Sequence, residues 1–130
     1  MAGFMLDQLR VLPSAALELP MPRDARALRL ALRLREACGE AASLDRLAHA
    51  AGGSRRTLER LFRKETGMSL GRWRQQVRLL QAMRLLARGE PVTSTALEVG
   101  YESPSAFIAA FSNALGTTPG RYFKAKADRV

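Results

Sequence analysis

Basic side chains are concentrated in one stretch of this sequence, residues 54–88. The stretch holds ten arginines and lysines against two glutamates, a net charge of +8, while the whole 130-residue chain carries +9. Its basic residues are Arg55, Arg56, Arg60, Arg63, Lys64, Arg72, Arg74, Arg78, Arg84 and Arg88. A solvated surface mixes the two signs more evenly. Because guanidinium groups bind phosphates and pair with guanine edges, the stretch favours a nucleic-acid partner that is contacted in part through its phosphates.

Residues 54–66 have the pattern of an amphipathic helix that turns its charges outward. Leu58, Leu61 and Phe62 share one apolar face, and the charged residues occupy the other faces. Arginine is the commonest reader of guanine, and glutamate accepts a hydrogen bond from cytosine. The predicted base contacts are therefore Arg56, Glu59 and Arg60. The predicted phosphate contacts are Ser54, Arg55 and Arg63. For each single arginine, a solvated or phosphate-only side chain stays the alternative.

A second helical segment, residues 104–115, has no basic residue. Ser105 can hydrogen-bond to a base edge or a phosphate, and Ile108 can touch a thymine methyl group. Residues 90–120 carry three glutamates and no lysine or arginine, so we expect this segment to add less affinity and weaker discrimination. Helix N-termini predicted at Thr93 and Pro104 can still donate backbone N–H groups to phosphates.

Side chains that support catalysis or bind metals are scarce. His49 is the only histidine and lies within a predicted helix, where a solvated or hydrogen-bonded ring is expected. Cys38 is the only cysteine, so no internal disulfide can form, which fits a reducing cytosol. No cysteine or carboxylate cluster has metal-ligand spacing. We therefore predict no catalytic residue, no metal site and no cofactor, and hydrolase or transferase activity would overturn that prediction.

The elements that position these side chains are all predicted to be helices. Capping residues mark their starts, glycines mark their ends, and no segment alternates with a period of two. The predicted helices cover residues 24–39, 44–51, 55–66, 69–88, 93–99, 103–116 and 118–127. The predicted caps are Asp24, Ser43, Ser54, Ser69, Thr93, Ser103 and Thr118. The fold is therefore expected to be all-α, with about seven helices and a short one near residues 4–11.

The first of these helices is predicted to be amphipathic. Leu28, Leu32 and Cys38 lie near one face, and three further apolar residues widen it. The widening residues are Leu30, Ala31 and Leu34. The arginines of this helix fall mostly on its other faces.

An internal repeat relates the two candidate DNA-reading segments. Residues 48–52 match residues 96–100, and after one inserted residue the match continues through the following helices. The paired residues include Ser54 with Ser103, Leu58 with Phe107, Phe62 with Phe111, Gly67 with Gly116, and Trp73 with Tyr122. The matches fall on caps, core positions and glycine stops, and Gly52 and Gly100 stand where a tight turn needs positive φ. Two matched copies of helix, glycine turn and helix predict two helix-turn-helix units.

The helix at residues 69–88 is predicted to join the two units. Its roughly 20 residues span roughly 30 Å, close to the ~34 Å of one DNA turn. A single chain could then read two successive segments of the major groove. The predicted organisation is a linker segment (1–22), a first helix-turn-helix subdomain with the joining helix (23–89) and a second helix-turn-helix subdomain (90–130).

The run of residues 44–123 resembles the DNA-binding region of the AraC/XylS family. In the first unit the resemblance rests on Leu47-Ala48, Ala51-Gly52, Ser54, Leu58, Arg60, Phe62 and Glu65-Thr66-Gly67. In the second unit it rests on the run Ala96 to Phe107, which reads ALEVGYESPSAF, and on Gly116 to Tyr122, which reads GTTPGRY. The resemblance implies a bacterial activator or repressor that binds double-stranded promoter DNA and recruits or blocks RNA polymerase. It also implies base-reading positions at Arg56, Glu59, Arg60, Ser105, Ile108 and Ala109.

Two departures from the family pattern fall in the second unit. Thr95 stands where the family usually has a core isoleucine or valine, so a hydroxyl there is expected to weaken packing unless it bonds back to a carbonyl one turn earlier. Ser112 and Asn113 stand where basic residues are common, which is expected to weaken phosphate contact.

The resemblance also bears on what accompanies this chain. Family members usually carry a separate sensor or dimerisation domain, and residues 1–22 look like the linker that follows such a domain. We expect this chain to be a fragment that lacks the sensor, with a small stand-alone regulator as the alternative. No signal peptide or membrane-length apolar run is present in the sequence, so a cytoplasmic location is expected.

Two other classes of binding protein fit part of the pattern. A basic amphipathic helix at residues 69–88 would suit an anionic membrane surface. Trp73, Leu79, Leu80 and Leu85 of that helix are better explained as core residues. A helix-turn-helix module that binds a protein partner is the other alternative, and it predicts no salt-sensitive affinity for DNA.

Overall fold

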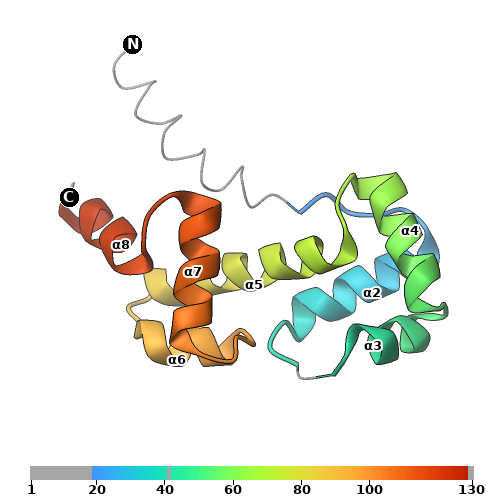
Figure 1. Cartoon of the computed structure of the whole chain (residues 1–130), viewed down its shortest axis with the longest axis horizontal. Coiled ribbons are helices and arrows are strands. Elements are labelled where there is room, and N and C mark those ends of the chain that lie inside the picture. The colour runs from blue at the N-terminus through green and yellow to red at the C-terminus, as the bar shows by residue number, and fades with distance from the viewer. Residues whose placement is uncertain (1–18, 41, 129–130) are drawn as a thin grey trace, which may run out of the picture. The chain divides into compact units, whose positions relative to one another are not determined.

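The computed structural model describes residues 19–40 and 42–128 of the chain (Figure 1). All regular secondary structure in these residues is helical, which confirms the predicted all-α class. The helices are α2 (Ala25–Glu36), α3 (Leu44–Ala51), α4 (Arg55–Thr66), α5 (Leu70–Ala87), α6 (Val92–Glu98), α7 (Pro104–Leu115) and α8 (Pro119–Asp128). The predicted short helix near residues 4–11 lies outside the described residues, as does most of the predicted linker segment 1–22.

Side-chain caps begin the helices at most of the predicted places. The hydroxyls of Ser43, Ser54 and Ser103 accept hydrogen bonds from backbone N–H groups three residues later, at 3.3, 3.1 and 3.1 Å. Three helices end at glycines in the left-handed region, where a side chain would be strained. These glycines are Gly52 (φ 109°), Gly67 (φ 77°) and Gly116 (φ 77°). Local capping chemistry therefore sets the ends of α3, α4 and α7.

Two predicted helix ends are wrong. Helix α6 begins at Val92 with Pro91 as its N-cap and has no side-chain cap, so Thr93 lies inside the first turn. Pro91 has the extended backbone of an N-cap residue, with φ −63° and ψ 149°, and proline favours this φ. Helix α2 ends at Glu36, three residues before Gly39, because Ala37 leaves the helical region with φ −131°.

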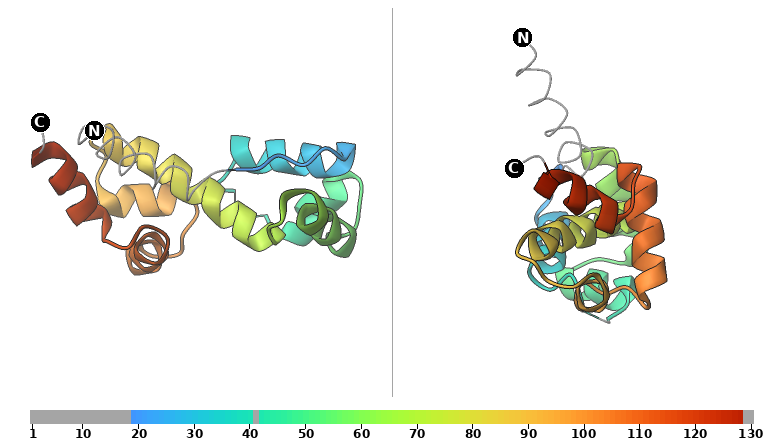
Figure 2. Two further views of the ribbon diagram at one scale, coloured as in Figure 1. Left: turned by 90° about the horizontal axis from the view of Figure 1, so that it is seen from above. Right: turned by 90° about the vertical axis from the view of Figure 1, so that its left-hand side faces the viewer.

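The described residues form two compact units, residues 19–78 and residues 79–128, and the boundary between them falls within α5. In the first unit, α2, α3 and α4 contact one another pairwise (Figure 2). The core centres on Trp73, which is fully buried and meets Phe62 of α4 edge to face at 5.4 Å between ring centroids. The Trp73 indole Nε1 donates a hydrogen bond to the Pro20 carbonyl at 2.8 Å, which joins the segment before α2 to this core.

The buried face of α2 differs from the predicted one. Leu30, Ala31 and Leu34 are buried together with Ala27, while Leu32 is 44% exposed. The spacing of the buried residues, at i, i+3, i+4 and i+7, is that of a single helical face. Leu32 falls on the opposite side, so its predicted place in the main apolar face is wrong.

The second unit has an aromatic core. Phe107 and Phe111 of α7 are fully buried, and α7 contacts both α6 and α8. Tyr101, Phe107, Phe111 and Tyr122 form a chain of ring contacts with centroid separations of 5.5, 5.9 and 5.9 Å. Tilted and edge-to-face ring contacts add to the stabilisation that comes from burying aromatic area.

Most of the apolar side chains of α5 are buried. Trp73, Leu79 and Leu85 are buried, as predicted for core residues, whereas Leu80, predicted with them, is only half-buried. Across residues 19–40 and 42–128, no helix combines the length and apolar character needed to cross a bilayer.

Thr95 of α6 is a buried polar residue in an otherwise apolar core. Its side chain is fully buried, and within the described part of the chain its hydroxyl has no hydrogen-bond partner. The carbonyl one turn earlier, on Pro91, accepts from the Thr95 N–H and from the Ser94 hydroxyl instead. An unpaired buried hydroxyl destabilises the fold, because hydration is lost and no bond replaces it.

Replacement of Thr95 by valine should stabilise the protein. Thr95→Val removes the unpaired hydroxyl and keeps the β-branched shape, so the free energy of unfolding is expected to rise by about 1 kcal/mol. Denaturant titration would measure the change, with Thr93→Val on the exposed side of α6 as the matched control. A loss of stability in Thr95→Val would contradict the assignment of the hydroxyl as unpaired.

A second stability prediction concerns the N-cap of α2. Asp24 Oδ1 accepts from the backbone N–H groups of Arg26 and Ala27 at 2.9 and 3.3 Å. The hydrogen bond from the Arg26 side chain, together with these backbone bonds, lowers the pKa of Asp24 from 3.8 to about 2. A carboxyl group with a lower pKa in the folded state stabilises the protein above its unfolded pKa, and that stabilisation is lost as the pH falls through its folded pKa.

The melting temperature of the wild-type protein should therefore fall between about pH 4 and about pH 2, in part because of Asp24. Asp24→Asn keeps a capping oxygen but cannot ionise, so its melting temperature should fall less over this interval. Thermal denaturation followed by circular dichroism would measure both proteins. Asp45→Asn, at an exposed carboxylate of α3, is the matched control, and an unchanged pH dependence in Asp24→Asn would contradict the assignment.

Candidate nucleic-acid interface

Helix α4 has one buried face and one exposed face. Leu58 and Phe62 are fully buried against the rest of the first unit, in which α4 contacts α2 and α3. The Leu58 side chain packs directly on Gly53 in the turn before α4, because a Cβ atom there would lie 2.6 Å from Leu58 Cδ2. Packing on this side leaves the opposite side of α4 open to a partner.

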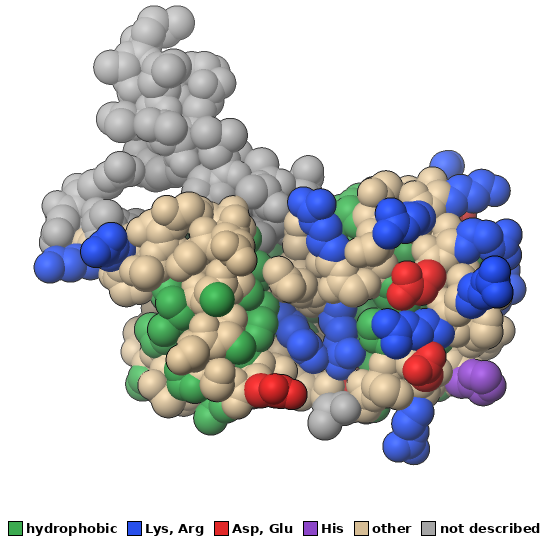
Figure 3. Space-filling view, viewed as in Figure 1, with side chains coloured by type: hydrophobic (Ala, Val, Ile, Leu, Met, Phe, Trp, Pro, Cys, Tyr) green, Lys and Arg blue, Asp and Glu red, His purple; other side chains and the backbone are tan. Residues whose placement is uncertain are grey.

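The predicted DNA contacts of the first unit gather on that open side. Arg56, Arg60 and Arg63 are exposed, and within the described ranges none of them forms a hydrogen bond or an ion pair. Lys and Arg side chains gather over the first unit in Figure 3, whereas the surface of α6 and α7 shows none. Unpaired guanidinium groups on one helix face can bind phosphates or base edges without first breaking an internal bond.

The other two predicted contacts of α4 are paired with each other. Arg55 Nε lies 3.4 Å from Glu59 Oε1, and Arg55 Nη1 lies 3.8 Å from Asp45 Oδ2 of α3. These pairs are exposed, so they add little stability. They place a cation beside the Glu59 carboxylate, which offsets the repulsion that this carboxylate would meet near phosphates.

A shallow hollow lies along the same face of α4. It is lined by Glu59, Arg60, Arg63, Lys64 and Gly67. Lys64 was not among the predicted DNA contacts. Its spacing of four residues from Arg60 could have placed it on the same face, because residues i and i+4 lie on one side of a helix.

Two arginines of the basic stretch serve the fold instead. Arg74 Nη2 donates to the carbonyls of Glu40 and Ala42 at 2.9 and 3.3 Å, and Arg78 Nε donates to the Cys38 carbonyl at 3.2 Å. Burial, together with repulsion from Arg78, lowers the pKa of Arg74, while Glu40 acts in the opposite direction. These side chains hold the loop between α2 and α3 onto α5, so they are not counted among the candidate phosphate contacts.

The predicted contacts of the second unit lie mainly on the exposed side of α7. Ser105 and Ala109 are exposed, Ile108 is half-buried, and Pro104 occupies the first turn of the helix. Thr93 is exposed near the start of α6. Since residues 90–120 contain no lysine or arginine, this surface offers hydroxyls, apolar groups and helix N-termini to a partner.

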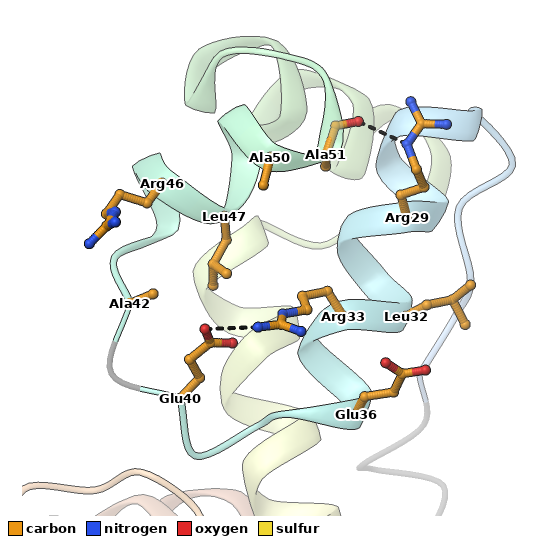
Figure 4. A pocket seen from close by; sticks show the side chains of 10 residues that line it. All are labelled: Arg29, Leu32, Arg33, Glu36, Glu40, Ala42, Arg46, Leu47, Ala50 and Ala51. Carbon is orange, nitrogen blue, oxygen red and sulfur yellow. Dashed lines mark hydrogen bonds and ion pairs between the residues drawn. The ribbon is translucent and has the colours of Figure 1, made fainter.

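The groove between α2 and α3 has a different character (Figure 4). Two of its three arginines bind within the protein. Arg29 Nε donates to the Ala51 carbonyl at 3.0 Å, and Arg33 forms an ion pair with Glu40 at 2.9 Å. These contacts hold α2 to the end of α3 and to the loop that follows α2. Across residues 19–40 and 42–128, no group of three or more His, Cys, Asp and Glu side chains could hold a metal ion.

Comparison with known proteins identifies the family. Residues 47–125 match the family described as "Helix-turn-helix domain". The HTH-type transcriptional regulator NimR of Escherichia coli (strain K12) is 36% identical over 118 residues, which cover 91% of this chain and 43% of NimR. The chain spans less than half the length of the curated relatives it matches.

Solved structures agree with this match. The DNA-binding domain of AdpA, a global transcriptional factor solved in complex with a target DNA, is 34% identical with a TM-score of 0.75, over 82% of this chain and 96% of that one. A Chromobacterium violaceum transcriptional regulator, described among AraC-type DNA-binding domain-containing proteins, is 27% identical with a TM-score of 0.69, over 74% of this chain and 87% of that one. The chain therefore belongs to the AraC-type helix-turn-helix family, as its sequence motifs had indicated.

Proposed function

We propose that this chain binds double-stranded DNA in a sequence-specific manner and regulates transcription from promoters. Helix α4 would enter the major groove with Arg56, Glu59 and Arg60 at base edges. Ser54, Arg55 and Arg63 would contact flanking phosphates. In this proposal the protein acts in the cytoplasm by binding DNA and catalyses no reaction.

The observation that carries the proposal is the exposed basic face of α4. Among the residues that the structure describes, three arginines on this face have no internal partner, and the opposite face is buried. A helix with this arrangement can insert into a groove and remain anchored to its own domain. The DNA-binding domain of AdpA has a similar fold and was solved in complex with a target DNA, which supports this proposal.

We propose a smaller role for the second unit. Ser105, Ile108 and Ala109 of α7 would touch a second segment of the major groove. The N-terminal turns at Thr93 and Pro104 would donate backbone N–H groups to phosphates. Without lysine or arginine, α7 would contribute less affinity than α4. For the whole protein, we also propose contact with RNA polymerase and a separate sensor domain.

Selection from a randomised duplex pool, followed by titration of the selected site at several salt concentrations, tests this function. Enrichment of one bipartite site, with affinity that falls steeply as salt rises, would support it. Salt-sensitive binding without an enriched sequence would contradict specific recognition. A complete lack of binding would favour a module that binds a protein partner.

Two arginines of α4 should respond differently to truncation. Arg60→Ala should weaken binding to the selected site by about 1–3 kcal/mol and relax the preference at one base pair, because a bidentate base contact is lost. Arg63→Ala should weaken binding to all sequences alike and reduce the salt slope by about 1, because a phosphate contact is lost. Fluorescence anisotropy at several salt concentrations separates the two effects.

Arg35→Ala, at an exposed arginine of α2, is the matched control for these variants and should change neither quantity. Unchanged affinity and unchanged sequence preference in Arg60→Ala would remove Arg60 from the proposed base contacts.

A gain of charge on α7 tests the second unit. Asn113 is exposed on α7, at a position where the family resemblance implies a basic residue. Asn113→Lys should raise affinity for the selected site and increase the salt slope by about 0.9, the value for one further phosphate contact. Ala50→Lys, on the exposed side of α3 beside the groove with α2, supplies the same charge as a control. Equal increases in affinity and salt slope in the two variants would argue against contact between α7 and DNA.

A further inference from the structure

A carboxylate on α4 accepts hydrogen bonds from the backbone at the start of α2. Glu65 Oε1 accepts hydrogen bonds from the backbone N–H groups of Arg23 and Asp24, at 2.7 and 2.9 Å. Asp24 is the N-cap of α2, and its own carboxylate accepts from the first turn of that helix. The last turn of α4 and the first turn of α2 therefore share one hydrogen-bonded cap.

The usual capping box explains why Glu65 is needed. In that motif a glutamate three residues after the N-cap reaches back to the N-cap N–H group. In α2 this position is Ala27, which has no acceptor. The acceptor comes instead from α4, 41 residues further along the chain than Asp24. Withdrawal of the carboxylate would leave two N–H groups without these partners, since no other described side chain accepts from them.

A second bond fastens the same short segment. The Pro20 carbonyl accepts from the indole of Trp73, whose ring packs edge to face on Phe62 of α4. Residues 20–24, which we term the strap, are thus bound at one end to the Trp73–Phe62 core and at the other to Glu65. The strap holds the C-terminal half of α4 through Phe62 and Glu65. At the start of α4, Arg55 lies 3.8 Å from Asp45 of α3.

Glu65 lies on the packed side of α4. It follows Leu58 by seven residues and Phe62 by three, so it shares their face and points away from Arg56, Glu59 and Arg60. The bonds from the Asp24 and Arg23 N–H groups lower the pKa of Glu65, because they stabilise its carboxylate form. Glu65 is therefore placed to affect DNA binding only through the position of its helix.

We propose that Glu65 is a positioning residue for DNA reading, which fixes the tilt of α4 through the strap and never touches DNA. This inference rests on the proposed function. Bidentate base contacts tolerate displacements of only about 0.5 Å, whereas phosphate contacts made by long, flexible side chains tolerate larger ones. Loss of the Glu65 bonds should therefore reduce discrimination between sequences more than it reduces total affinity for DNA.

Three variants test the proposal. Glu65→Ala removes the acceptor, Glu65→Asp withdraws the carboxylate by one methylene group, and Glu65→Gln keeps an acceptor oxygen at the same reach. For each protein, affinities are measured for the selected site, for that site with one base pair changed in the half read by α4, and for an unrelated duplex. The measurements are made well below the melting temperature of each variant.

Glu65→Ala should lower the ratio of affinities for the selected and altered sites by about tenfold, the scale of one base-pair mismatch. Binding to the unrelated duplex should change by less than about twofold, because phosphate contacts persist. Glu65→Asp should fall between Glu65→Ala and the wild type, and Glu65→Gln should restore most of the discrimination. Amide hydrogen exchange at Arg23 and Asp24 should be faster in Glu65→Ala, which reports the broken cap directly.

Faster exchange at Arg23 and Asp24 with unchanged discrimination would overturn the positioning role and leave the proposed function intact. A loss in Glu65→Gln as large as in Glu65→Ala would overturn the hydrogen-bond mechanism. If Glu65→Ala does not fold, the same measurements of amide exchange and sequence discrimination are made on Glu65→Asp, and the same outcomes decide. A wild-type protein that does not discriminate between sites would overturn the proposed function and this inference with it.

Discussion

The burial of one face of α4 is the constraint on which the rest of the first unit depends. Leu58 and Phe62 are fully buried, and Phe62 meets Trp73, the largest fully buried side chain of the described residues. Removal of these apolar groups from water stabilises the unit. Because a helix repeats its faces every 3.6 residues, the same packing presents Arg56, Arg60 and Arg63 to solvent. Core and candidate DNA surface are thus two sides of one helix.

The basic stretch divides into structural and available arginines. Arg74 and Arg78 both donate to carbonyl groups of the loop between α2 and α3. Buried carbonyl groups need donors, and arginine can supply several from one side chain. Arg56, Arg60 and Arg63 have no such internal task within the described part of the chain. Net charge alone therefore overstates how many cations a DNA partner could meet.

The two helix-turn-helix units share a frame and differ in what they offer. Both have a serine-capped second helix with two buried core residues and a glycine stop in the left-handed region. Helix α4 adds a basic face, whereas α7 has no basic residue and follows a helix that buries the unpaired hydroxyl of Thr95. The repeat conserves what the fold requires, since caps, core and stops are needed in any unit. The exposed faces are free to diverge, which supports unequal roles for the two units in the proposed function.

The sequence by itself determined the features that depend on contacts within a few residues. Serine caps, glycine stops and the apolar faces of α4 and α7 follow from local hydrogen bonds, backbone φ and helical period, so the all-α class, most helix ends and the exposure of the α4 arginines were predictable. The start of α6 was missed, because proline and threonine caps compete within three residues there.

Only the tertiary structure decided which face of α2 is buried, which arginines bind loop carbonyls, and that Glu65 caps α2. These contacts join residues some 30 to 50 positions apart, as in Arg74 with Ala42, Glu65 with Asp24 and Trp73 with Pro20. Side-chain type and spacing give no signal for such pairs. They form because burial of the apolar faces brings the segments together, and the polar groups trapped nearby must then find partners.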